Sequence, residues 1–251
     1  MINIGIVCEG DRDYDMIKSV IACFIEDEYH TLFLQPNQEF GTDNGNGWKG
    51  VIRWLQYHNS DLEKYLSEIT PSIDLLIIQM DADVARCEKE IYCSSVTVEC
   101  DGQTIEDFLN CSIIKNKRCP QSLPPNSVCD GTPTERVSFL KQFLNSILVA
   151  HAGIHYVVTI PCDATDAWIV AAFEEEMDCL EQINDPWNII SHNKYYHGIR
   201  IHGNKKSKKP YERLIDSVCE KWDFVKHKCP QAFQFEMDCK TELSSILSPV
   251  Q

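Results

Sequence analysis

The chain alternates short apolar runs with longer amphipathic segments, which is the pattern of an α/β protein. Four apolar runs predict strands, at Ile2–Val7, Thr31–Leu34, Leu75–Met80 and His155–Pro161. The third run is almost continuously apolar, as in a strand that is buried on both faces in the middle of a parallel sheet. It ends abruptly in two acids, in the sequence L-L-I-I-Q-M-D-A-D.

Between these runs, apolar residues recur every three or four positions, which predicts amphipathic helices. The first two predicted helices lie at about Arg12–Glu28 and Trp48–Ile69. A third begins at Thr132–Glu135, and a fourth follows a cap at Asp163 or Thr165. A helical extension with two short helices is expected from about Pro210 to the C-terminus. Strands and helices alternate, so we predict a Rossmann-like, mainly parallel sheet flanked by helices, within a single domain over residues 1–251.

Residues 84–133 break this pattern and are predicted to be an insertion at the edge of the sheet. They are rich in Cys, Ser, Asn and Pro, and a short hairpin is expected around Val96–Thr104. The 13 cysteines include no CxxC pair, and no secretory leader precedes the first strand. We interpret them as reduced thiols, with a structural zinc site in the insertion as an alternative whose spacings fit no common zinc module.

Composition narrows the class of protein. The 251 residues are 43% hydrophobic, which is enough for a sizeable core. No apolar run in the sequence is long enough to span a bilayer, so we expect a cytoplasmic protein with no membrane partner. The net charge of -15 is unusual for a nucleic-acid binder. Contact with nucleic acid would have to be local, metal-assisted or shared with another subunit, and the acidity also fits docking on a basic partner.

Acids gather after three of the predicted strands. They are Glu9 and Asp13 after the first, Asp81 and Asp83 after the third, and Asp163 and Asp166 after the last. The carboxyl ends of parallel strands meet at one edge of the sheet, where ligands bind in open α/β folds. Residues two apart on an extended backbone point the same way, so Asp81 and Asp83 could both face a hard cation. The alternative is that Asp81 only caps a turn or a helix.

Two motifs resemble the Toprim domain of topoisomerases, primases and the overcoming-lysogenization-defect nucleases. They are I-V-C-E-G-D-R-D after the first strand and L-L-I-I-Q-M-D-A-D after a later one. The resemblance implies that Glu9 serves as a general acid/base or metal ligand and that Asp81 and Asp83 bind Mg²⁺. Asp13 matches an acid that nuclease members carry four residues beyond the glutamate.

Much of the remaining chain is similar to small stand-alone Toprim-like proteins that are linked to prokaryotic defence and to partner ATPases. The similarity lies in the glycine-rich G-T-D-N-G-N-G-W and in a strand-Pro-x-x-x-x-D-A-W segment. Asp166 stands where those proteins usually have glutamate, which gives the same charge a shorter reach. The resemblance makes Asp166 a candidate ligand for a second metal ion.

The sequence has one dense positive run, formed by Lys205, Lys206, Lys208 and Lys209. We predict that these lysines contact phosphate, and the alternative is a solvated loop before the helix at Pro210. The Ser, Cys and His residues show no spacing typical of a catalytic triad. His58 lies on the apolar stripe of a predicted helix, so we expect it in the core. Cys8 has the anion Glu9 as its neighbour, which argues against a nucleophilic thiol.

These observations support a nuclease that depends on Mg²⁺ or Mn²⁺ and hydrolyses DNA or RNA, with DNA favoured over RNA, as an effector of antiviral defence. The alternative is a non-catalytic or conditionally active subunit that binds a partner ATPase, which the net charge of -15 favours. Homo-oligomerisation is compatible with either function. A nucleotide-sugar glycosyltransferase that uses D-A-D as its metal motif is a third alternative, but it does not account for Glu9-Gly10.

Overall fold

The structure is a computed structural model that describes residues 1–37, 44–87, 133–148, 151, 153–177, 180 and 183–248. Most of the predicted insertion, including the hairpin expected at 96–104 and nearly all of its cysteines, lies outside the described residues. The same holds for residues 38–43 of the glycine-rich segment.

Four parallel strands form the central sheet, which confirms the predicted α/β class with a parallel sheet. They are β1 (Ile2–Val7), β2 (Tyr29–Gln35), β3 (Leu75–Gln79) and β4 (Tyr156–Thr159), in the order β2-β1-β3-β4. The carboxyl ends of β1, β3 and β4 therefore lie next to one another. This order places the acids that follow these three strands at one edge of the sheet.

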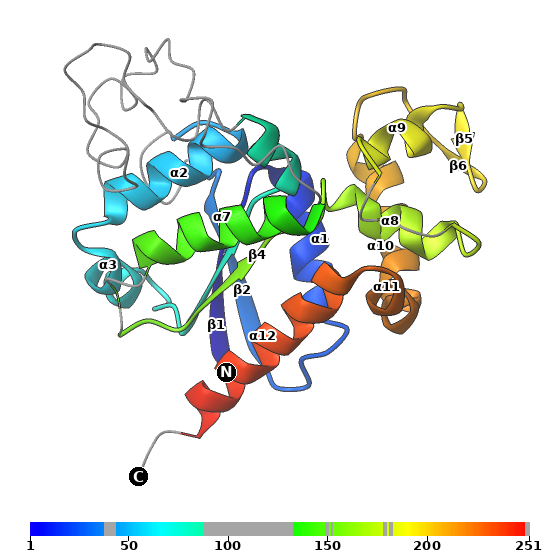
Figure 1. The fold of residues 1–251 in the computed structure, drawn as a ribbon. Coiled ribbons are helices and arrows are strands. Elements are labelled where there is room, and N and C mark those ends of the chain that lie inside the picture. The colour runs from blue at the N-terminus through cyan, green and yellow to red at the C-terminus, as the bar shows by residue number, and fades with distance from the viewer. Residues whose placement is uncertain are drawn as a thin grey trace, which may run out of the picture.

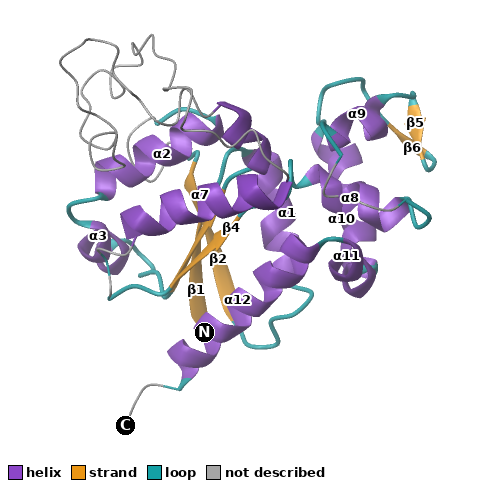
Figure 2. Cartoon of the chain, viewed as in Figure 1, coloured by secondary structure: helices purple, strands orange, loops and turns teal. Residues whose placement is uncertain are grey.

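Helices cover both faces of the sheet (Figures 1 and 2). One face packs against α1 (Asp11–Ile21), α8 (Asp166–Phe173), α10 (Lys208–Glu220), α11 (Trp222–Lys228) and α12 (Pro230–Leu247), and the other against α2 (Gly47–His58), α3 (Leu62–Glu68), the 3-10 helix η2 (Ala82–Cys87) and α7 (Pro133–Leu148). Leu75 and Ile77 of β3 face the first layer, and Leu76 and Ile78 face the second. The uninterrupted apolar run of β3 is explained by this two-sided burial.

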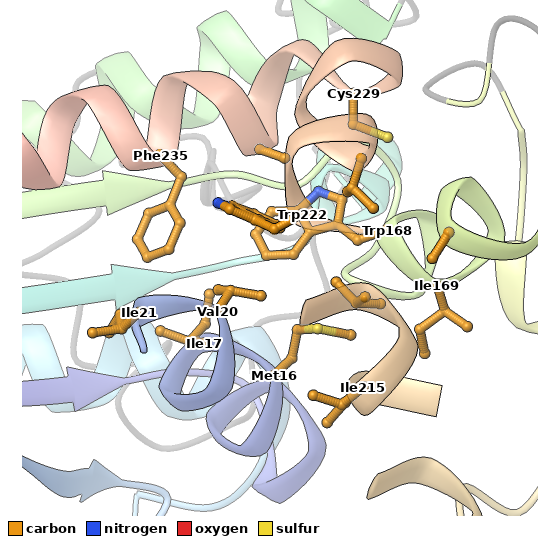
Figure 3. Packing of buried hydrophobic residues seen from close by; sticks show 14 of the residues in the cluster. Met16, Ile17, Val20, Ile21, Trp168, Ile169, Ile215, Trp222, Cys229 and Phe235 are labelled. Carbon is orange, nitrogen blue, oxygen red and sulfur yellow. The ribbon is translucent and has the colours of Figure 1, made fainter. Parts of the chain in front are cut away.

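The core of the first face is dominated by aromatic and branched side chains (Figure 3). Ile17 and Val20 of α1 are fully buried there. The ring of Trp168 in α8 meets Trp222 edge-on at 5.6 Å between centroids and stacks on Phe235 at 6.1 Å. These contacts fix the start of α8, and with it Asp166, against the sheet.

The predicted helix over Trp48–Ile69 is wrong in its continuity, because α2 ends at His58 and α3 begins at Leu62. The break falls on Asn59, Ser60 and Asp61, whose short polar side chains compete with helical backbone hydrogen bonds. His58 lies in the core as expected, although its Nδ1 forms no hydrogen bond with any of the residues that the structure describes.

The first predicted helix is also too long at its C-terminal end. It was expected to run to Glu28, but α1 ends at Ile21 and a turn follows. The acids of E-D-E at 26–28 would lie at the negative end of the helix dipole, which disfavours continuing the helix there.

Two parts of the C-terminal half differ from expectation. The polar stretch after α8 folds into α9 (Pro186–Ser191) and a small hairpin, β5 (Tyr195–Tyr196) and β6 (Ile199–Arg200), neither of which was predicted. The last helix, α12, spans 18 residues and is not short. Within the described part of the chain, no helix is both long and apolar enough to cross a membrane.

Ile77 offers a test of the two-layer packing. Its side chain is fully buried in β3, and Ile77→Ala should lower the free energy of unfolding by about 2–5 kcal/mol because it leaves a cavity. Leu247→Ala, at a residue that is 52% exposed at the end of α12, should change it by no more than about 0.5 kcal/mol. Urea unfolding measures both, and equal effects of the two substitutions would contradict this packing.

Candidate functional site

The acids predicted to converge do lie together at the carboxyl edge of the sheet. Glu9 follows β1, Asp81 follows β3, and Asp13 lies in the first turn of α1. Each of these carboxylates acts electrostatically on the others. We refer to Glu9, Asp13, Asp81 and Asp83 as the acid cluster.

Glu9 and Asp81 are held together by backbone and side-chain hydrogen bonds. The backbone N–H of Asp81 donates to Oε1 of Glu9 at 2.8 Å. Gln79, which is fully buried at the end of β3, accepts from the Glu9 backbone N–H at 3.2 Å and donates to Oδ1 of Asp81 at 2.7 Å. A single amide therefore orients both acids. Sequence reasoning missed Gln79, although a polar residue at the end of an apolar strand is a usable signal.

The glycine-rich segment approaches Glu9 closely. The N–H of Gly47 donates to the Glu9 carbonyl oxygen at 2.7 Å. Gly47 has a φ of +71°, which an L side chain rarely adopts, and a Cβ built there would lie 3.9 Å from Oε2 of Glu9. The described end of this segment thus covers one side of the acid cluster.

Thr165 connects Asp13 and Asp81, a role that the sequence did not predict. Its hydroxyl donates to Oδ1 of Asp13 at 2.7 Å, and its backbone N–H donates to Oδ1 of Asp81 at 3.3 Å. Thr165 occupies the residue before α8, as predicted, but its side chain makes no capping hydrogen bond because the hydroxyl is given to Asp13. A threonine ahead of α8 therefore orients acids from two other elements.

Asp166 lies beside the acid cluster with both of its carboxylate oxygens engaged. Lys206 Nζ contacts Oδ2 at 2.5 Å, and the hydroxyl of Tyr211 donates to Oδ1 at 3.1 Å. The ammonium of Lys206 also lies 5.6 Å from the ring centroid of Trp187. Asp166 is almost fully buried, so it could bind a metal ion only if Lys206 moved away. Lys206, predicted to contact phosphate, here neutralises an acid of the protein itself.

The D-x-D segment is not extended, contrary to the expectation that Asp81 and Asp83 would point the same way. The chain turns into η2 at Ala82, and the Asp83 N–H donates to the carbonyl oxygen of Asp163 at 3.1 Å. Asp83 is exposed, whereas Asp81 is partly buried. The negative charge of Asp83 still acts on both Glu9 and Asp81.

Asp163 is a structural residue. It is buried with a φ of +62°, its Oδ2 accepts the backbone N–H of Asp185 at 2.7 Å, and Arg136 lies 3.9 Å from its Oδ1. Its carboxylate therefore ties the turn after β4 to the start of α9 and to α7.

Burial and mutual repulsion raise the pKa values of the acid cluster. Burial, reinforced by Asp13 and Asp83, raises the pKa of Glu9 to about 8 even though the Asp81 N–H lowers it. Burial raises the pKa of Asp13 to about 6, against the lowering effects of Thr165 and Lys206. The pKa of Asp81 is raised by burial and by the neighbouring acids. The edge of the sheet thus holds more negative charge than its own cations compensate.

The neighbouring acids also raise the pKa values of Lys206 and Cys8. Burial alone would lower the pKa of Lys206, but Asp166, Asp81 and Asp13 raise it well above its ordinary value, which keeps the ammonium charged. Burial and Asp13 raise the pKa of the Cys8 thiol. A neutral thiol is a poor nucleophile, which confirms the sequence-based argument against nucleophilic chemistry at Cys8.

The carboxylates of the acid cluster are groups of the kind that bind divalent cations. Carboxylate oxygens are the ligands that Mg²⁺ and Mn²⁺ prefer, and the raised pKa values show that a cation would stabilise the ionised acids. In the described part of the chain, no three His, Cys, Asp or Glu side chains are arranged to hold a metal ion. Mg²⁺, however, usually keeps several waters and uses one or two carboxylates with substrate phosphates. Glu9 and Asp81 are the pair that fits this mode.

The other predicted phosphate contacts lie outside the acid cluster. Lys205, Lys208 and Lys209 are exposed, and Lys208 lies 3.9 Å from Glu212. His197 contacts Glu174 at 2.9 Å and His192 lines a separate pocket, so neither joins these acids.

No protein-family model, curated protein or solved structure matches this chain. The Toprim resemblance therefore stays a prediction from the motif residues around Glu9 and Asp81.

Glu9 should give the metal-free protein a pH-dependent stability. Folding raises its pKa from about 4.5 to about 8, so the folded state holds a proton that the unfolded state releases. The free energy of unfolding should therefore fall as the pH rises from about 4.5 to about 8. Urea unfolding across this range measures the slope, and Glu9→Gln, which cannot ionise, should flatten it most between about pH 6 and 8. Identical slopes in both proteins would contradict the raised pKa.

Lys206→Met should destabilise the protein by about 1–3 kcal/mol, because it leaves the buried carboxylate of Asp166 without its cation. Lys208→Met removes the same charge from an exposed pair and should change stability by less than about 1 kcal/mol. Chemical unfolding at pH 7 compares the two variants. If both lose the same stability, the Lys206–Asp166 ion pair does not stabilise the fold.

Proposed function

We propose that this protein is a metal-dependent phosphodiesterase of the Toprim type that cleaves nucleic acid, DNA in preference to RNA. The observation that carries the proposal is the hydrogen bond from the Asp81 backbone to the Glu9 carboxylate, which joins the E-G and D-x-D motifs in one acidic edge. In-line attack on a phosphodiester requires negative charge to be neutralised on the attacking and leaving oxygens. An acidic edge that lacks compensating cations is suited to binding the ions that do this.

Glu9 and Asp81 would hold the Mg²⁺ or Mn²⁺ ion, which supplies charge neutralisation at the scissile phosphate. Gln79 and Thr165 keep Asp81 oriented through the two hydrogen bonds that its Oδ1 accepts. As an alternative to ligating the ion, Glu9 could act as a general acid/base, since burial raises its pKa in the metal-free protein to about 8. Asp13, fixed by Thr165, adds negative charge from α1.

A conditionally active subunit is the second candidate, and the Lys206–Asp166 ion pair favours it. Here the chain's own ammonium takes the place that a cation or a substrate contact would take. Such a site would become active only when a partner or a substrate draws Lys206 away. The net charge of -15 also suits a protein that docks on a basic partner, such as a defence ATPase.

Asp81→Asn tests the nuclease directly. The substitution keeps the size of the side chain but removes the charge that would hold the ion, so nicking of a supercoiled plasmid in Mn²⁺ should fall to background. The matched control is Asp27→Asn, an exposed acid that precedes β2 at the opposite edge of the sheet, and this variant should nick at the wild-type rate. Asp27→Asn should unfold at the wild-type urea concentration, and Asp81→Asn at that concentration or higher, because it removes a carboxylate whose ionisation burial and the neighbouring acids disfavour.

Equal nicking by Asp81→Asn and wild type would contradict the assignment. If the wild-type protein shows no cleavage but still binds Mn²⁺ with an affinity that Asp81→Asn loses, the conditionally active subunit is the better description. Wild-type protein that neither cleaves nor binds Mn²⁺ would contradict both candidates.

A further inference from the structure

A second surface has the opposite electrostatic character from the acid cluster. Residues 186–211 carry six Lys and Arg residues and no Asp or Glu, in a chain whose net charge is -15. They are Lys194, Arg200, Lys205, Lys206, Lys208 and Lys209, and all except Lys206 are exposed. We refer to residues 186–211 as the basic segment. A local concentration of exposed cations is the electrostatic signature of phosphate binding.

The basic segment forms α9, the β5–β6 hairpin and the start of α10, which lie together beside α8 and apart from the central sheet (Figure 1). The hairpin turns at His197 and Gly198, which both have positive φ, as a tight two-residue hairpin requires. Tyr195 pairs with Arg200 across the two strands. Directly opposed side chains have Cβ atoms about 5 Å apart, so the side chains of Tyr195 and Arg200 leave the hairpin on the same face.

The hairpin and α9 border an open pocket of about 520 Å³. It is lined by aromatic, imidazole, amide and carboxylate groups, among them Glu174, Asn188, His192, Tyr195, Tyr196 and His197. This volume lies within the range of small-molecule sites, and few convergent polar groups among rings are typical of such sites. The pocket is separate from the acid cluster, which contributes none of its lining residues.

Two tyrosines give the pocket its chemistry. The ring of Tyr195 is 55% exposed with Lys194 Nζ 5.9 Å from its centroid. The hydroxyl of Tyr196 is buried, and burial together with the neighbouring Glu174 carboxylate raises its pKa. The first group offers a stacking face next to a cation, and the second is engaged with a carboxylate that lines the same pocket.

We propose that this pocket binds a nucleobase of a single-stranded nucleic acid, with the exposed cations of the basic segment holding the adjacent phosphates. The proposal rests on the proposed function and names the form of its substrate. Stacking on Tyr195 accepts any base, and the side chains of Asn188 and His192 can hydrogen-bond to a base edge. An acidic protein partner would use the cations but would not need a stacking ring and an amide-lined pocket.

The pocket lies within reach of the acid cluster. Asp166 begins α8, and Glu174, which lines the pocket, follows its last residue, Phe173. Eight helical residues span roughly 12 Å at about 1.5 Å per residue. With stacked nucleotides spaced about 3.4 Å apart along one strand, a base in the pocket would be a few nucleotides away from a phosphate at Asp81.

Binding of a fluorescein-labelled, mixed-sequence single-stranded oligonucleotide to the metal-free protein tests this proposal by anisotropy. Tyr195→Ala should weaken binding about 5- to 150-fold because it removes one stacked base. Tyr195→Phe keeps the ring and should bind as wild type does. Tyr57→Ala is the matched control, since Tyr57 is 59% exposed on α2, and it should leave binding unchanged.

Three further probes identify the ligand. An oligonucleotide with abasic sites should bind more weakly than the intact strand, and a duplex should not show the loss caused by Tyr195→Ala. Adenosine monophosphate should compete with the labelled strand, because it carries one base that can stack on Tyr195 and one phosphate. Equal binding of intact and abasic strands, wild-type affinity of Tyr195→Ala, or no binding of single strands by the wild-type protein would each overturn the proposal.

The test separates this inference from the proposed nuclease. Asp81→Asn should lose cleavage and keep single-strand binding, whereas Tyr195→Ala should lose binding and keep the metal affinity of the wild type. If Asp81→Asn cleaves normally while Tyr195→Ala binds poorly, the metal assignment fails and the base pocket stands. If the protein nicks duplex DNA but no single strand binds, the nuclease stands and the base pocket fails.

Discussion

Repulsion between buried carboxylates at one edge of the sheet is the constraint on which the surrounding structure depends. Glu9, Asp13 and Asp81 lie close together with limited access to water; Asp13 raises the pKa of both Glu9 and Asp81, and Glu9 raises that of Asp81. Such a group is stable only if protons, hydrogen-bond donors or cations compensate it. The donors are specific: the amide of Gln79, the hydroxyl and N–H of Thr165, and the Asp81 N–H.

The fold brings these compensating groups to the site from distant parts of the chain. The strand order puts β1 next to β3 and β3 next to β4, so the residues after each strand share one edge. Thr165 reaches the acids because Trp168 anchors α8 in the apolar core. Lys206 reaches Asp166 from the loop that precedes α10, forty residues later in the chain. The apolar packing of one face therefore determines which charges meet at the edge.

The sequence predicted the parts of this arrangement that follow from periodicity and topology. Apolar runs located the four strands of the sheet, and the rule that parallel strands end at one edge predicted that Glu9 and Asp81 lie together. It could not predict that Lys206 pairs with Asp166, because a contact between loops depends on side-chain packing. The hairpin at Tyr195 was missed because strands of two residues carry no periodic signal. The break between α2 and α3 was hidden by an apolar stripe that continues across it.

The acid cluster and the basic segment are not independent, because Lys206 belongs to the second and contacts the first. A divalent cation at Glu9 and Asp81 would repel the Lys206 ammonium, which is held by the field of Asp166, Asp81 and Asp13. A phosphate bound to the basic segment would attract the same ammonium. Binding of the cation and binding of the phosphate would therefore each weaken the Lys206–Asp166 ion pair. This ion pair disfavours both binding events. Because linkage is reciprocal, a metal ion and a phosphate that both weaken this ion pair would strengthen the binding of one another.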